Sequence, residues 1–221
     1  MAKVQQLIDH IREGRYDRAF TRLYAADEKA LEKQKARYIQ ALGQFALYYG
    51  TDRETALYSA PGRTEIGGNH TDHNRGKVLT AAVNLDTVAA VSPREDGMVN
   101  VHSEGYPAIS ISLDDLAARE DEKNTTAALI RGVAYKLQEE GYKIGGFDAA
   151  VTSTVRGGSG LSSSAAFEVM LCAIFDELYN QGTLDYKHRA KISQFAENVY
   201  FGKPSGLLDQ MASSTGGLAY I

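Results

Sequence analysis

The stretch 157-GGSGLSSSAAFEVM-170 places a glycine-rich turn and three consecutive serines directly before an apolar, helix-forming run. A helix N-terminus has unpaired N–H groups and a partial positive charge, and glycines let the backbone approach an anion closely. The preceding run FDAAVTSTV has the pattern of a strand. The order strand, glycine turn, helix therefore predicts a phosphate-binding turn. The alternative is a flexible connector with a serine cap.

The residues that could bind phosphate at this turn differ from those of a Walker-type P-loop. The sequence contains no GxxxxGK[ST] pattern, so it lacks the lysine on which that motif depends. Phosphate binding would instead rest on backbone amides and on the hydroxyls of Ser162, Ser163 and Ser164, which can also bind a hydrated Mg²⁺.

The chain before this turn divides near residue 50. Residues 1–50 have helical periodicity, with Val4, Leu7 and Ile11 on one face, and we expect a helical N-terminal extension. From residue 51 the helical periodicity ends, and short β-rich runs separated by Gly, Pro, Asn and Asp follow. These runs are ALYSA, KVLTAAVNL, TVAAVSP, MVNVHS and AISISL. We therefore expect an α+β fold over residues 51–221, with a mixed, mainly antiparallel sheet packed against helices.

Further helices are predicted in the second half of the chain. Asn124 can cap a helix that ends near Glu140 and stops at Gly141, and other helices are expected at 161–180, 186–201 and 206–214. The final GGLAYI then begins a strand. A strand that ends without a partner leaves ladder groups unpaired, so we expect a truncated chain; the alternative is that GGLAYI forms an edge of the sheet.

A polar stretch, 61-PGRTEIGGNHTDHNRG-76, lies between two strand-like runs. It is too polar for a core strand, and we expect a loop. Arg, His and Asp at short spacing among glycines suit hydrogen bonding to a hydroxyl-rich ligand, although a solvated connection is the alternative. His70 and His73 lie on either side of Asp72, but no further donor lies at a recognisable spacing, which argues against a transition-metal site.

A third polar stretch, 196-AENVYFGKPSGLLDQMASSTGG-217, sets Glu197 and Asp209 on either side of a break at Gly202, Pro204 and Gly206. One carboxylate could hold a metal while the other handles a proton, as phosphoryl transfer to an alcohol requires. The alternative is an ordinary helix-turn-helix with surface acids.

Composition narrows the possible partners. The net charge of −4 and the scattered basic residues argue against nucleic-acid binding. No apolar run approaches ~18 residues, so no membrane span is predicted. The single cysteine, Cys172, lies in the apolar run MLCAIF, which excludes a disulfide framework and favours a reducing cytoplasm.

Together, the three motifs resemble those of the galactokinase, homoserine kinase, mevalonate kinase and phosphomevalonate kinase superfamily, the GHMP kinases. PGRTEIGGNHTDHNRG resembles the galactokinase signature, GGSGLSSSAAFEV the phosphate-binding turn and AENVYFGKPSGLLDQMAS the catalytic segment. The resemblance covers about residues 55–221. It implies a ribosomal-protein-S5-like N-terminal domain, with the family's ferredoxin-like C-terminal half absent from this sequence, and transfer of a phosphoryl group from ATP to a sugar hydroxyl with Mg²⁺.

The resemblance also implies a role for individual residues. Asp209 would act as base or orient the acceptor hydroxyl, Arg63 would stabilise charge beside it, and Ser164 and Glu197 would hold Mg²⁺. The residues implied to cradle the phosphates are Gly157, Gly158, Ser159, Gly160, Leu161, Ser162, Ser163 and Ser164. The residues implied to bind the sugar are Arg63, Asn69, His70, Asp72, Gly206 and Asp209.

Four positions depart from the galactokinase pattern, namely Glu65, Asn69, His73 and Arg156. Asn69 stands where galactokinases have a glutamate that binds a sugar hydroxyl, and an amide cannot supply a full negative charge. Galactose is the leading acceptor. The alternatives are another hexose or a polyol, and a regulator that binds sugar and ATP without turnover.

Overall fold

The computed structural model describes residues 1–25 and 27–221. Seven strands form one sheet in the order β1-β2-β3-β6-β4-β5, with β7 paired to β3. The β4–β6 pair is parallel and the other pairs are antiparallel. The strands are β1 (Ala2–Lys3), β2 (Glu54–Gly67), β3 (Leu79–Arg94), β4 (Met98–Ser103), β5 (Ile109–Ser112), β6 (Gly146–Ser153) and β7 (Leu218–Tyr220).

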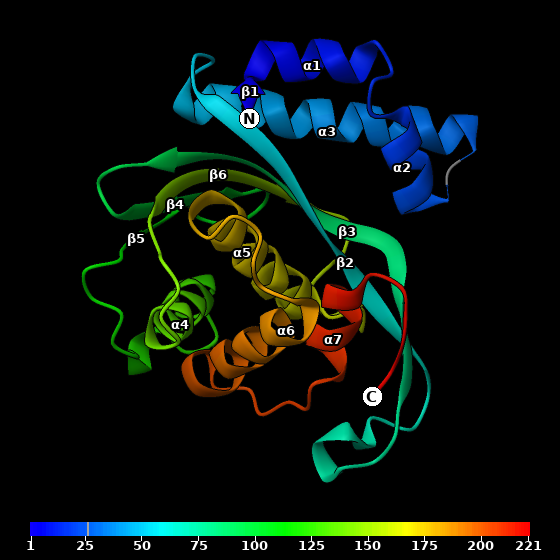
Figure 1. Ribbon diagram of the computed structural model, residues 1–221, viewed down its shortest axis with the longest axis vertical. Coiled ribbons are helices and arrows are strands. Elements are labelled where there is room, and N and C mark those ends of the chain that lie inside the picture. The colour runs from blue at the N-terminus through cyan, green and yellow to red at the C-terminus, as the bar shows by residue number, and fades with distance from the viewer. Residues whose placement is uncertain (26) are drawn as a thin grey trace.

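Helices cover both faces of the sheet (Figure 1). On one side lie α1 (Val4–Arg12), α2 (Asp17–Tyr24) and α3 (Glu28–Tyr49). On the other lie α4 (Thr126–Glu139), α5 (Ser163–Tyr179), α6 (Tyr186–Phe195) and α7 (Leu208–Thr215). Short turns η1 (Thr71–Asn74) and η2 (Glu120–Glu122) are 3₁₀-helical, and η3 (Ala196–Phe201) continues α6 as a π-helix. The result is a three-layer α+β fold.

Two apolar cores lie on opposite faces of the sheet, and successive side chains of the central strands point alternately into one and the other. On β3, Val88 and Ala90 pack against the N-terminal helices, while Ala89 and Val91 pack against the layer of α4 and α5. Side chains of a strand point alternately to opposite faces, so one strand serves both cores. The N-terminal helical segment is thus packed on the back of the sheet. Among the described residues, no helix is long and apolar enough to span a membrane.

The polar stretch 61–76 does not form a loop throughout, and this expectation is wrong for its first half. Residues 61–67 continue β2, with Arg63 opposite Ala82 and Glu65 opposite Thr80 on β3. Arg63 is compatible with a strand because its buried guanidinium is paired with a carboxylate. The two runs KVLTAAVNL and TVAAVSP likewise join into the single strand β3, in which Asp86 is buried among hydrogen-bond donors.

Two smaller expectations also change. The first concerns α4, which is capped by Thr125 rather than Asn124: Thr125 Oγ1 accepts from Ala128 N at 3.4 Å, and Asn124 itself has a left-handed φ of 62°. The second concerns the final strand, which is paired: Leu218 lies opposite Ala81 and Tyr220 opposite Leu79. GGLAYI therefore forms an edge of the sheet, and the expected truncation of the chain stays a prediction.

Candidate active site at the junction of two pockets

The glycine turn before α5 has a left-handed backbone at three positions. Gly158 and Gly160 have φ of 74° and 75°, and Ser162 at the N-cap has φ of 60°. Glycine adopts this conformation without steric cost, whereas a serine there is uncommon. Ser159 donates from both its amide and its hydroxyl to the carbonyl of Arg156. The sequence therefore bends the chain tightly just before the amides of the first turn of α5.

Strand β2 approaches this turn closely. Arg63 N donates to Leu161 O at 3.1 Å. A Cβ atom on Gly62 would lie 2.9 Å from the same carbonyl oxygen and 3.0 Å from Val155. Glycine is therefore required at residue 62 for the strand to contact the turn, and this contact positions Arg63.

Arg63 joins the glycine turn to α7. Its Nε donates to Asp209 Oδ1 at 2.5 Å, its NH2 group forms an ion pair with the same carboxylate, and its NH1 group donates to Gly160 O at 2.5 Å. The second carboxylate oxygen, Asp209 Oδ2, accepts from Ser162 Oγ at 2.5 Å. Since Arg63 and Asp209 are 7% and 9% exposed, their geometry is fixed by packing.

Glu197 on η3 accepts four side-chain hydrogen bonds. Oε1 accepts from Ser164 Oγ at 2.7 Å and Lys203 Nζ at 2.9 Å, and Oε2 accepts from Ser205 Oγ and Gln210 Nε2, both at 2.7 Å. Burial alone would raise the pKa of this carboxyl group, but the donors, led by Ser164, lower it below its usual value. Glu197 is therefore held as an anion.

The pair Ser164 and Glu197 fits the chemistry of a magnesium site. Mg²⁺ prefers hard oxygen ligands, takes one or two carboxylates from the protein and keeps several waters. Glu197 supplies an ionised carboxylate, and the Ser164 hydroxyl at the start of α5 contacts it directly. Among the described residues, no group of three or more His, Cys, Asp or Glu side chains surrounds a possible metal position. A cation here would share its coordination with water and ligand oxygens.

Behind Glu197 lies a second, fully buried acid. Glu168 on α5 is 0% exposed, and its Oε2 accepts from Gln210 Nε2 at 3.2 Å. Burial, and then the nearby charge of Glu197, raise the pKa of Glu168 well above its ordinary value. Gln210 thus donates to both carboxyl groups through the same amide nitrogen.

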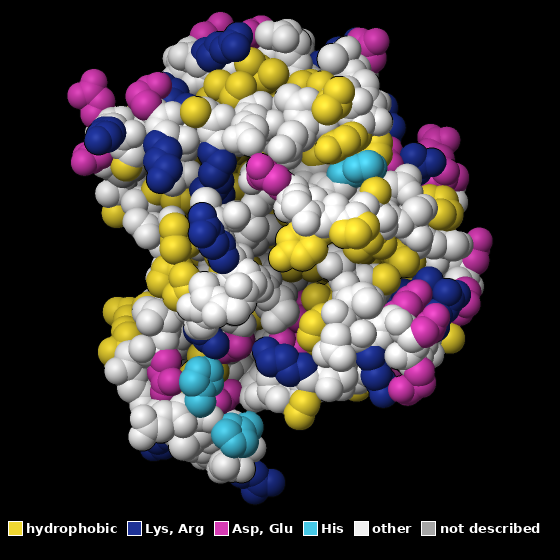
Figure 2. Space-filling model, turned by 180° about the vertical axis from the view of Figure 1, so that it is seen from behind, with side chains coloured by type: hydrophobic (Ala, Val, Ile, Leu, Met, Phe, Trp, Pro, Cys, Tyr) yellow, Lys and Arg dark blue, Asp and Glu magenta, His cyan; other side chains and the backbone are white. Residues whose placement is uncertain are grey.

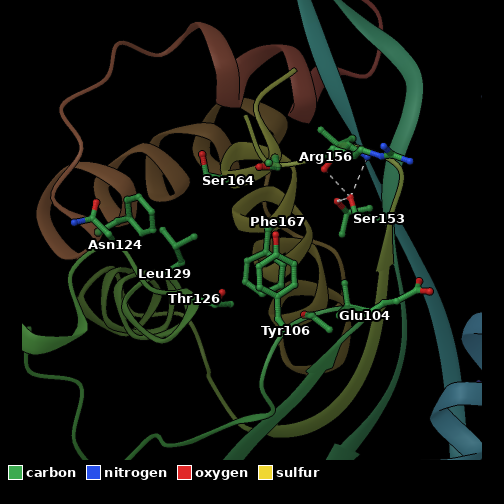
Figure 3. Close-up of a pocket in the computed structure, with 16 residues that line it drawn as sticks. Glu104, Tyr106, Asn124, Thr126, Leu129, Ser153, Arg156, Ser164 and Phe167 are labelled. Atoms are coloured by element: carbon green, nitrogen blue, oxygen red, sulfur yellow. Dashed lines mark hydrogen bonds between the residues drawn. The ribbon is translucent and has the colours of Figure 1, made fainter. Parts of the chain in front are cut away.

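The first pocket opens beside the glycine turn and has a volume of about 600 Å³. Figure 3 shows Asn124, Thr126 and Leu129 on one side, Ser153 and Arg156 on the opposite side, and Ser164 at the end near α5. Tyr106 and Phe167 supply aromatic surface, and Gly157 and Ser163 also line the pocket. Its lining combines apolar and aromatic side chains with the start of a helix, as a nucleotide site requires.

The second pocket, of about 320 Å³, is polar and lies on the other side of Asp209. Its lining residues are Arg63, His70, Asp72, His73, Lys203, Pro204, Ser205, Gly206 and Asp209. Figure 2 shows histidines and charges of both signs gathered at the lower end of the molecule, over the segment after β2. Such a lining suits a ligand rich in hydroxyl groups.

Asp72 connects the loop after β2 to the start of α7 in this pocket. Its Oδ2 accepts from Leu208 N at 2.9 Å, at the start of α7, so it holds the helix that carries Asp209. A Cβ on Gly206 would lie 1.8 Å from the same oxygen, and only glycine fits there. Asn69 lies outside the residues that line either pocket, and its expected role in sugar binding stays a prediction. Its backbone is left-handed, with a φ of 54°, and the next residue, His70, donates from its amide to Glu65 Oε1.

Several residues of the site were not predicted from the sequence. Lys203, Ser205 and Gln210 all contact Glu197, but they lie six, eight and thirteen positions away. No motif marks them individually. The signal that could have found them is their place in the same segment as Glu197 and Asp209, since the turn at 202–207 folds back on η3.

Comparison with known families agrees with this geometry. Residues 43–93 match the galactokinase galactose-binding signature, and residues 128–217 match the GHMP kinases N terminal domain. Among solved structures, galactokinase from Lactococcus lactis in complex with galactose superposes with a TM-score of 0.74 at 28% identity, covering 84% of this chain and 51% of that one. Mevalonate kinase from Methanococcus jannaschii shares the fold, with a TM-score of 0.64 at 14% identity over 76% of this chain and 53% of that one.

The fold and both matches show that the chain belongs to the GHMP kinase superfamily. Within it, the sequence is similar to the galactokinases. Galactokinase from Streptomyces coelicolor is 41% identical over 173 residues, covering 77% of this chain and 44% of that protein. Galactokinase from Bacillus subtilis is 34% identical over 178 residues, covering 79% and 45%. The chain thus spans less than half the length of these relatives. The expected family and α+β fold are confirmed.

Proposed function

We propose that this chain forms the nucleotide- and sugar-binding part of an ATP-dependent galactokinase, which transfers the γ-phosphoryl group to the anomeric hydroxyl of galactose. The main support is the Arg63–Asp209–Ser162 contact, because it joins the glycine turn of the first pocket to the wall of the second. Similarity to galactokinases over 77% of the chain supports galactose as the acceptor.

In this proposal, ATP lies in the first pocket with its phosphates against the amides of residues 157–164, and galactose lies in the second, beside His70, Asp72 and Gly206. Mg²⁺ held near Ser164 and Glu197 would neutralise phosphate charge. Asp209 orients the acceptor hydroxyl and accepts its proton as the bond from oxygen to the γ-phosphorus forms. The bond to the β-phosphate oxygen breaks, and ADP leaves.

The chain's own residues supply positioning and charge neutralisation. Arg63 fixes one oxygen of Asp209 and holds a positive charge beside the glycine turn. Little covalent chemistry is required of a protein that transfers a phosphoryl group, so accurate placement provides most of the rate. A carboxylate whose two oxygens are held by Arg63 and Ser162 is placed in this way.

The extent of the functional unit is part of the proposal. We propose that residues 51–221 form one domain, that residues 1–50 are a helical extension packed on its sheet, and that the part of the matched galactokinases not covered by this chain supplies the other wall of the cleft. We also propose a cytoplasmic location, where ATP is available and the buried free thiol of Cys172 stays reduced.

Release of ADP in the presence of a panel of sugars tests this function, in a protein that also contains the part of the matched galactokinases not covered by this chain. We expect ADP release that depends on galactose, with the phosphate found on the anomeric oxygen. Glucose, mannose and sugar alcohols serve as controls. Release with another acceptor but not with galactose would contradict the assigned substrate, and stabilisation by sugar without ADP release would contradict the assigned activity.

A further inference from the structure

Lys203 lines the second pocket, and the proposed mechanism gives it no role. Its side chain is 52% exposed and lines the second pocket together with Arg63 and Asp209. Its Nζ lies 2.9 Å from Glu197 Oε1, the oxygen that also accepts from Ser164 of the first pocket. Ser164, Glu197 and Lys203 thus form a continuous contact from one pocket to the other.

Each of the two cationic side chains of the second pocket is paired with a carboxylate. Arg63 is paired with Asp209 through two of its nitrogens, and its third contacts Gly160 O. Lys203 is paired with Glu197. Among the residues lining the second pocket, these two side chains carry permanent positive charge. Whereas the guanidinium of Arg63 is buried with all three nitrogens occupied, Lys203 has a single ion-pair partner and a half-exposed, flexible stem.

Glu197 cannot serve Lys203 and a metal ion equally. Lys203 carries an ammonium group at neutral pH, and its Nζ lies 2.9 Å from Glu197 Oε1. Two cations at one carboxylate oxygen repel each other at short range. A metal ion bound to Glu197 Oε1 would therefore displace the ammonium of Lys203. The flexible four-carbon side chain of Lys203 would then let the ammonium reach the oxygens of a ligand in the second pocket.

We propose that Lys203 is an exchangeable cation, which pairs with Glu197 when the metal is absent and contacts the phosphoryl group of the metal–nucleotide complex when it binds. This proposal rests on the proposed kinase function. It assigns a second mobile positive charge to the transferred group, beside the fixed charge of Arg63. It also predicts that the lysine competes with the metal when nucleotide is absent.

Two binding measurements on the 221-residue chain test this proposal. The first is the affinity for Mn²⁺ alone, followed by the paramagnetic resonance of the free ion; the second is the affinity for a non-hydrolysable ATP analogue with Mg²⁺. Lys203→Met should tighten Mn²⁺ binding about threefold to tenfold, because a competing cation is lost, and weaken analogue binding about tenfold, because a charged phosphate contact is lost. Lys203→Arg should restore most of the analogue affinity.

Lys136→Met is the matched control, because Lys136 is also partly buried and paired with acids, Glu139 and Glu140, away from both pockets. It should change neither affinity. Unchanged or weakened Mn²⁺ binding in Lys203→Met would overturn the exchange, and unchanged analogue binding would overturn the phosphate contact. A wild-type chain that binds neither the analogue nor Mn²⁺ would instead refute the proposed function, and this proposal with it.

Discussion

Arg63 and Asp209 are separated by 146 positions in the sequence, yet Arg63 Nε donates to Asp209 Oδ1 at 2.5 Å. The contact joins β2 to α7 across the glycine turn, since Arg63 also donates to Gly160 O. Three segments that are distant in the sequence thereby meet at one carboxylate. This meeting point lies between the two pockets and underlies the proposed kinase function.

Replacing Asp209 by Asn should abolish most transfer without unfolding the protein. The amide keeps the shape of the side chain but cannot accept the proton of the acceptor hydroxyl, so kcat should fall by about 10²- to 10⁴-fold. Steady-state kinetics with ATP and galactose measure this. Asp121→Asn, a change in the exposed turn η2, is the control. More than a tenth of wild-type kcat in Asp209→Asn would exclude it as the base.

Replacing Arg63 by Lys should also reduce turnover, although the charge is retained. An ammonium cannot contact Asp209 through two nitrogens and Gly160 O through a third in the same geometry. We expect kcat to fall by about 10²- to 10³-fold, comparable to the loss of one stabilising group in other active sites. Wild-type kcat in this variant would show that charge alone, rather than orientation, is required.

Gly206→Ala should destabilise the sugar pocket. The new Cβ would lie 1.8 Å from Asp72 Oδ2, so the loop or the start of α7 must move. We expect a loss of about 1–3 kcal/mol in the free energy of unfolding and weaker galactose binding. Chemical denaturation and calorimetry measure the two effects. Gly217→Ala is the control, because nothing lies within 4 Å of its Cβ position. Equal stability of both variants would contradict the packing assigned to Gly206.

Glu168→Gln should stabilise the protein at neutral pH. Because burial raises the pKa of Glu168, the folded state holds a proton that the unfolded state releases above a pH of about 4.5. Its contribution to stability is therefore full below that pH and is lost as the pH rises. The amide, which mimics the protonated acid, should remove this loss and raise the free energy of unfolding at pH 7. The gain should vanish near pH 4. A gain independent of pH would contradict this account.

Asp86→Ala should loosen the attachment of the N-terminal helices. Asp86 accepts from Tyr24 and Ser59, both at 2.5 Å, and forms an ion pair with Arg37. Loss of the buried carboxylate leaves the guanidinium of Arg37 without its partner and should cost about 3–5 kcal/mol. Thermal unfolding measures this. Asp52→Ala removes an exposed ion pair with Lys3 and should have no measurable effect. Equal effects of the two changes would show that the buried cluster has no special role.

Local patterns in the sequence predicted the helices, the strands and the glycine turn, because spacing and turn chemistry act over a few residues. Local patterns could not predict that Arg63 lies in a strand, because its burial there depends on pairing with the distant Asp209. The donors Ser205 and Gln210 were missed for the same reason, because their role follows from the fold of the turn after η3. The role of Asn69, which rests on the resemblance alone, stays a prediction, since Asn69 is not among the residues that line either pocket.

The most direct test is a crystal structure with a non-hydrolysable ATP analogue, Mg²⁺ and galactose. We expect the triphosphate against the amides of residues 157–164 and the anomeric hydroxyl of galactose within hydrogen-bond distance of Asp209, in line with the γ-phosphorus. A triphosphate bound away from the glycine turn, or a sugar bound outside the pocket lined by Arg63 and Asp209, would contradict the account.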